Sequence, residues 1–202
     1  MNFEDSARSL LRTMNYPTER LEYFDFLIDK DKNVGKMYGN HQVIDSPIAN
    51  KSIHDLIDEN RIFNNYGYDV QEWNKQHCSI NTDKHEGIDI TCSMNEEILS
   101  PVDGKVTKID ENSIEITSDK IDFWYEEKEY KTRVTIDNIE ISNFALNSEV
   151  KAGDVIGIPT PNHRCGTLNN TLNVNNRYIH MKIEINYSAG IWTAVDPRII
   201  IS

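Results

Sequence analysis

The stretch Arg177-Tyr178-Ile179-His180-Met181-Lys182-Ile183-Glu184-Ile185 alternates between apolar and polar side chains over nearly its whole length. Because successive side chains of a β-strand point to opposite faces of a sheet, this pattern predicts a strand with one apolar and one polar face. The polar face carries Tyr178, His180, Lys182 and Glu184. We therefore expect a strand that covers a hydrophobic core and presents an imidazole on its other side.

Upstream of this strand, short runs rich in β-branched residues each end at a turn signal, at residues 97–99, 104–109, 113–117 and 130–136. Short strands at such spacing predict an antiparallel β domain. The block Val150-Lys151-Ala152-Gly153-Asp154-Val155-Ile156-Gly157 predicts a hairpin of two strands joined by a tight turn. Its glycines stand where a Cβ would obstruct the turn or the packing. Residues 159–176 hold few apolar residues and predict a long loop.

The first sixty residues have a helical texture instead. Apolar residues at helical spacing predict helices at residues 6–14 and 21–28. Ser52 is expected to cap a third helix, with Asp55 in its first turn and Leu56 and Ile57 facing inward. The change of texture near residues 60–66 predicts a small helical N-terminal segment, 1–61, followed by a β domain, 62–202.

Composition restricts the partners of the chain. Its 202 residues carry a formal net charge of −12, which argues against nucleic acid, because a phosphate backbone requires a basic surface. The chain has no run of 18 apolar residues, and Glu4 and Asp5 stand where a signal peptide needs positive charge. We therefore expect membrane attachment only through a segment outside this chain.

The cysteines Cys78, Cys92 and Cys165 are odd in number and lack Cys-x-x-Cys spacing. They predict neither a disulfide framework nor a cysteine zinc site, and their disulfide state stays open.

A metal site is suggested by His85 and Asp89, which are four residues apart; Gly87 between them is expected to let the backbone turn without a Cβ clash. A zinc site that acts on a substrate needs three protein ligands and one open position, and imidazole and carboxylate groups suit zinc. His180, on the polar face of its strand, is the best third candidate. The alternative is an ordinary loop pair and an exposed strand histidine, with no metal bound.

Five blocks of the sequence occur in an order known from one family. They are His85-x-Gly-x-Asp89, the run 98–106, the run 150–157, Ile179-His180 and Val195-Asp196-Pro197. In this order and spacing, residues 66–198 resemble the lysostaphin and LytM-like zinc endopeptidases, which are peptidoglycan hydrolases. The N-terminal sixty residues resemble no family that we can name.

The resemblance implies a mainly β, antiparallel domain of the duplicated-hybrid-motif type, with a groove across its sheet. It implies zinc at the floor of the groove, held by His85, Asp89 and His180, and hydrolysis of a peptide bond by zinc-activated water. The implied substrate is a peptide of bacterial peptidoglycan. The implied location is extracellular or at the cell surface.

The chain departs from the family at two helper positions. Tyr178 and Asn138 stand where the family has accessory histidines, and Lys182 replaces an acidic residue. Loss of a positioned base typically costs about 10²- to 10⁴-fold in rate. A tyrosine can donate a hydrogen bond to an oxyanion, but with a reference pKa near 10 it is a poor base.

Other residues are candidates to replace those helpers. His163 in the long loop could take the place of an accessory histidine, and His77 is a weaker candidate. Glu86 adjoins His85 but is expected to point away from the metal, as a supporting or surface carboxylate.

The sequence therefore leaves two functions open. One is a zinc endopeptidase with an altered set of helper residues. The other is a weakened or non-catalytic domain that binds peptidoglycan or a partner protein through the same groove. In a third interpretation, His85, Asp89 and His180 bind no metal and only stabilise the fold.

Overall fold

The computed structural model describes residues 44–64, 85–121, 130–161, 176–188, 191–195 and 197. The expected helices at 6–14 and 21–28 lie outside these residues, as do His77, Cys78, His163, Cys165, Asp196 and most of the expected 159–176 loop.

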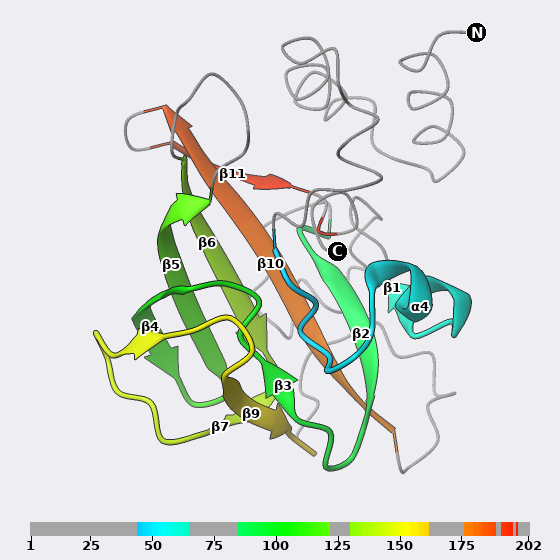
Figure 1. Ribbon diagram of the computed structural model, residues 1–202. Helices are drawn as coiled ribbons and strands as arrows, with labels where there is room; N and C mark the ends of the chain where they lie inside the picture. Colours follow the sequence, from blue (N-terminus) through cyan, green and yellow to red (C-terminus); the bar gives the residue numbers. More distant parts are fainter. Residues whose placement is uncertain are drawn as a thin grey trace, which may run out of the picture.

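Most of the described strands form one large antiparallel sheet (Figure 1). Its path runs β1-β2-β10-β6-β5-β4-β8, and β11 pairs with β10 beside that path. The strands are β1 (Ile62–Asn64), β2 (Ile88–Ser93), β4 (Gly104–Asp110), β5 (Ser113–Ile121), β6 (Tyr130–Asp137), β8 (Glu149–Val150), β10 (Asn176–Ser188) and β11 (Ile191–Val195).

A second, three-stranded antiparallel sheet has the order β3-β9-β7. It consists of β3 (Ile98–Leu99), β7 (Ile139–Ile141) and β9 (Val155–Pro159). Buried aliphatic residues of both sheets belong to one hydrophobic cluster, so the small sheet packs against the apolar side of the large one. The prediction of a mainly β, antiparallel fold is confirmed.

The strand β10 lies inside the large sheet and has neighbours along both edges. One of its edges pairs with β6 over residues 180–186, and the other pairs first with β2 and then with β11. Its alternating side chains follow the predicted pattern, because Ile179, Met181, Ile183 and Ile185 all lie in the hydrophobic cluster. This strand therefore carries the core on one face and the candidate site residues on the other.

Residues 44–58 pack into the same core. The helix α4 (Ile53–Asp58) is capped as predicted, because the Ser52 hydroxyl accepts from the Asp55 backbone N–H and the Asp55 carboxylate accepts from that of Ser52. Leu56 is fully buried, but the inward orientation expected for Ile57 is wrong, because Ile57 is 40% exposed. In a helix of one and a half turns, consecutive residues point about 100° apart, so only one of the two faces the core.

The predicted hairpin at 150–157 is corrected by the structure. Both strands exist, but β8 pairs with β4 in the large sheet and β9 pairs with β3 and β7 in the small one. The turn between them carries a left-handed Gly153, with φ of 86°, whose N–H donates to the Ser100 carbonyl. Because the turn is bonded to residues near 100, it connects the two sheets instead of closing a hairpin.

Within the described residues, no helix has both the length and the apolar character needed to span a membrane.

Candidate metal centre

Two of the three predicted ligands are placed by strand pairing. In the register of β2 with β10, Asp89 lies directly opposite His180. Asp89 lies between the core residues Ile88 and Ile90, so its own side chain points to the opposite face of the sheet. The alternation of both strands therefore brings a carboxylate and an imidazole together on the polar face.

His85 completes the cluster from the segment that precedes β2. Its Nε2 lies 3.1 Å from His180 Nδ1 and 3.5 Å from Asp89 Oδ1. The distance from His180 Nδ1 to Asp89 Oδ1 is 2.9 Å. His85, Asp89 and His180 thus form one group that could hold a metal ion.

The triangle of these atoms fits zinc. With zinc–ligand bonds of about 2.0–2.1 Å, tetrahedral geometry places neighbouring ligand atoms about 3.3 Å apart. The three distances, 2.9, 3.1 and 3.5 Å, lie around that value. Two ring nitrogens and a carboxylate oxygen that approach one point must share protons or bind a cation, and the donor set suits zinc.

The carboxylate is kept ionised in this position. Burial acts to raise the pKa of Asp89, but its hydrogen bonds to His180 and His85 outweigh burial and hold the pKa well below its usual range. Burial likewise acts to lower the pKa of His180, whereas the hydrogen bond that Asp89 accepts from His180 and the charges of Asp89 and Asp137 raise it overall. The Asp89 carboxylate therefore carries a negative charge, which attracts a cation.

Gly87 lies in a bend of the backbone just before β2, as the sequence predicts. Its φ is not in the left-handed region, which among the described glycines only Gly153 occupies. A Cβ at Gly87 would lie 2.4 Å from the Met181 carbonyl oxygen and 2.6 Å from Cε1 of His180. Gly87 is required because the ligand segment packs directly against β10 and the His180 ring.

Tyr178 and Asn138, at the expected helper positions, are hydrogen bonded to each other. Tyr178 is fully buried, and burial together with the charge of Asp89 raises the pKa of its phenol, so the hydroxyl stays protonated. Asn138 adopts a left-handed backbone, with φ of 66°, which asparagine tolerates well. The catalytic roles of the two residues stay predictions.

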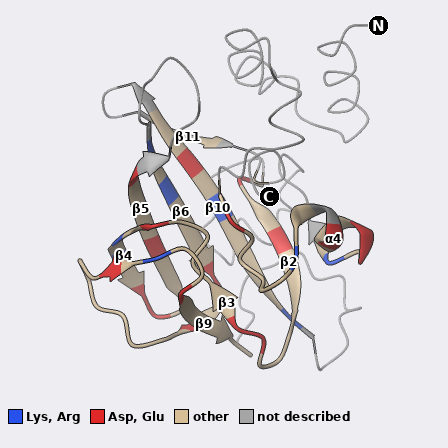
Figure 2. Cartoon of the chain, in the orientation of Figure 1, with Lys and Arg blue, Asp and Glu red and all other residues tan. Residues whose placement is uncertain are grey.

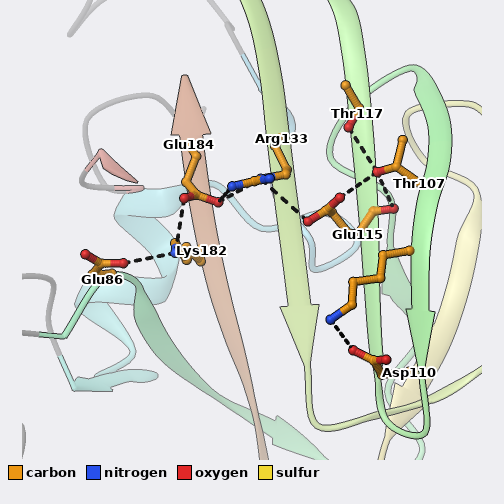
Figure 3. Close-up of polar contacts among 9 residues, drawn as sticks. Glu86, Thr107, Asp110, Glu115, Thr117, Arg133, Lys182 and Glu184 are labelled. Carbon is orange, nitrogen blue, oxygen red and sulfur yellow. Dashed lines mark hydrogen bonds and ion pairs between the residues drawn. The ribbon is translucent and has the colours of Figure 1, made fainter. Parts of the chain in front are cut away.

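The polar face next to the cluster holds a row of charged residues that sequence reasoning did not connect (Figures 2 and 3). The row runs from Glu115 on β5 across Arg133 on β6 and Glu184 and Lys182 on β10 to Glu86 in the segment before β2. Glu86, expected to point away from the metal, lies with its Oε2 2.9 Å from Lys182 Nζ. Alternation on β10 did signal that Lys182 and Glu184 share the face of His180, but the position of Glu86 depends on the fold.

Solved structures similar to this chain include the catalytic domain of the antimicrobial peptidase lysostaphin from Staphylococcus simulans, with 18% identity and a TM-score of 0.46, over 70% of this chain and 93% of that one. Helicobacter pylori Csd3 has 16% identity and a TM-score of 0.48, over 79% of this chain and 33% of its own. A zinc-containing peptidase from Vibrio cholerae has 16% identity and a TM-score of 0.47, over 78% of this chain and 39% of its own.

The chain therefore spans a third of Csd3 and about two fifths of the Vibrio cholerae peptidase. No protein-family model and no curated protein matches the sequence.

Proposed function

We propose that this protein is a zinc-dependent endopeptidase-like domain that acts on peptides of bacterial peptidoglycan, outside the membrane or at the cell surface. The observation that carries the proposal is the meeting of His85 Nε2, Asp89 Oδ1 and His180 Nδ1, at separations suited to one zinc ion. The order of the sequence blocks that resemble the lysostaphin and LytM-like peptidases supports the same substrate class.

The three ligand side chains leave one tetrahedral position for water or a substrate oxygen. When bound, zinc supplies a Lewis acid that polarises a carbonyl oxygen and makes water nucleophilic near neutral pH. Asp89 contributes the negative charge of the site. His180 is oriented by its strand and by Asp89, so its Nδ1 faces the other two ligand atoms.

A specific observation favours the second candidate, a weakened or non-catalytic domain that binds peptidoglycan or a partner protein. Tyr178 is fully buried and pairs with Asn138, and its raised pKa makes it a poor proton acceptor. A residue in this state does not replace a catalytic base. The metal site and the peptidase activity are therefore separate parts of the proposal.

The test measures zinc content and cleavage on the same preparation. We expect about one zinc per chain after purification without chelator, and cleavage of purified cell walls or of glycine-rich peptides. His180→Ala removes one ligand and should abolish both zinc retention and cleavage. A wild-type protein that retains no zinc in the presence of excess metal would overturn the metal site.

A double variant separates the two candidate functions. Tyr178→His combined with Asn138→His restores imidazoles at both helper positions, and histidine tolerates the left-handed backbone at 138. The peptidase predicts faster cleavage by this double variant. A protein that binds zinc and cell walls but shows no cleavage before or after the change is a binding domain.

A further inference from the structure

We propose that the ion pair between Glu86 and Lys182 positions the metal ligand His85. The inference rests on the proposed function only in taking His85, Asp89 and His180 as the ligands of one zinc ion. It assigns Glu86 and Lys182 a role as positioning residues that hold a ligand segment in place without touching the metal.

His85 is the ligand that strand pairing does not place. Asp89 and His180 face each other within the paired register of β2 and β10, and that register begins at Met181 opposite Ile88. His85 lies three residues before this first pair, in a segment without strand structure. Its ring must nevertheless bring Nε2 to within 3.1 Å of His180 Nδ1.

A side-chain contact ties this segment to β10. Glu86 adjoins His85, and its Oε2 lies 2.9 Å from the Nζ of Lys182. Lys182 is two residues beyond His180 on the same face of β10. The pair therefore joins the neighbour of one ligand to the strand of another, while Gly87 lets the intervening backbone rest on Met181 and His180.

Lys182 is itself held in place by the charged row shown in Figure 3. Its Nζ lies 3.2 Å from Glu184 Oε1, and the other oxygen of Glu184 accepts from Arg133 Nε at 2.8 Å and from its Nη2 at 2.7 Å. The Arg133 guanidinium lies over the Trp192 ring, 4.5 Å from its centroid. Lys182 is thus an anchored partner with a restricted set of positions.

Such a contact raises metal affinity because it restricts the conformations of His85 before zinc binds. Without the pair, the segment 85–87 samples more conformations, and zinc must restrict them on binding. Contacts of this outer kind typically change metal affinity by about 10- to 100-fold.

Lys182→Met is the decisive variant, because the two physical effects of this change have opposite signs. Removal of a positive charge near a cation site would by itself tighten zinc binding, whereas loss of the positioning contact weakens it. We expect zinc affinity, measured by competition with a chromophoric chelator, to fall by about 10-fold. Affinity that is unchanged or tighter would overturn the proposal.

Glu86→Gln should weaken zinc binding to a similar extent, and the double variant should lose less than the sum of the two single losses, since both break one contact. Glu115→Gln is the matched control. Glu115 lies at the far end of the same row, 3.5 Å from Arg133, with 19% of its side chain exposed against 23% for Glu86. Equal losses of affinity in Glu86→Gln and Glu115→Gln would indicate a general structural effect and contradict the positioning role.

Amide hydrogen exchange of residues 86–89 in chelator-treated protein gives a second readout that needs no metal. Exchange should be several-fold faster in Glu86→Gln than in wild type or Glu115→Gln, and equal rates would overturn the proposal. If the wild type binds no zinc, the metal site fails and the exchange rates still test the contact. If it binds zinc but cleaves nothing, only the peptidase activity fails.

Discussion

On one face of β10, Ile179, Met181, Ile183 and Ile185 are at most 3% exposed, while on the other face Tyr178 is equally hidden and His180 is partly exposed. The apolar face is stabilised by burial, which requires only that the side chains be hydrophobic and of suitable size. The polar face is also largely covered, and there each buried polar group needs a partner. Substitutions on the two faces should therefore destabilise the protein for different reasons.

The largest effect is expected from truncation on the apolar face. Ile183→Ala deletes buried methyl and methylene groups and should lower the free energy of unfolding by about 2–5 kcal/mol, measured by urea denaturation. The folded fraction should keep its zinc stoichiometry. Leu146→Ala is the control, because Leu146 is 59% exposed and its truncation should change stability by less than about 0.5 kcal/mol. Similar losses in the two variants would contradict the assignment of the core.

A smaller effect is expected on the polar face from Tyr178→Phe. The change keeps the buried ring and removes the hydroxyl that pairs with Asn138, so the free energy of unfolding should fall by about 0.5–1.5 kcal/mol. Zinc content should not change, because Tyr178 is not one of the ligands. A loss as large as that of Ile183→Ala, or no loss, would show that the hydrogen bond between Tyr178 and Asn138 does not stabilise the fold in this way.

The smallest effect is expected in the pH dependence of stability that the Asp89–His180 pair causes in chelator-treated protein. The lowered pKa of Asp89 contributes stability above its unfolded pKa of about 4, and this contribution is lost as the pH falls towards the folded pKa. The raised pKa of His180 contributes stability that is fully present below about pH 6.5 and is lost as the pH rises through the folded pKa.

The contribution of the pair should therefore be greatest between about pH 4 and 6.5 and should decline above that range. Unfolding measured across this range on wild type and Asp89→Asn tests the assignment. The variant should lose the decline above pH 6.5, and an unchanged profile would indicate that other groups cause it.

Much of the fold was predictable from local patterns. Alternation over 177–185 identified the central strand and its core-facing residues, because the period of a strand is two wherever it lies. The serine cap of α4 was equally readable, because the capping box joins residues three apart. These features depend only on neighbours in the chain.

The errors arose where distant segments decide the outcome. Ile57 and Leu56 are both apolar, and only packing against the core determines which of them is buried. The block 150–157 has the signals of a hairpin, yet its two strands pair with strands of different sheets. The bend at Gly87 was predicted, but the atoms that a Cβ would meet there were not, because they include the His180 ring, 93 positions further along the chain.

The sequence by itself determined the alternation of β10 and the spacing of His85 and Asp89, and it predicted which residues stand at the helper positions. Only the tertiary structure decided that His180 faces Asp89, that Tyr178 pairs with Asn138, and that Glu86 reaches Lys182. The reason is physical. Periodicity assigns a side chain to a face, whereas a contact needs the register between strands, which the packing of the whole sheet sets.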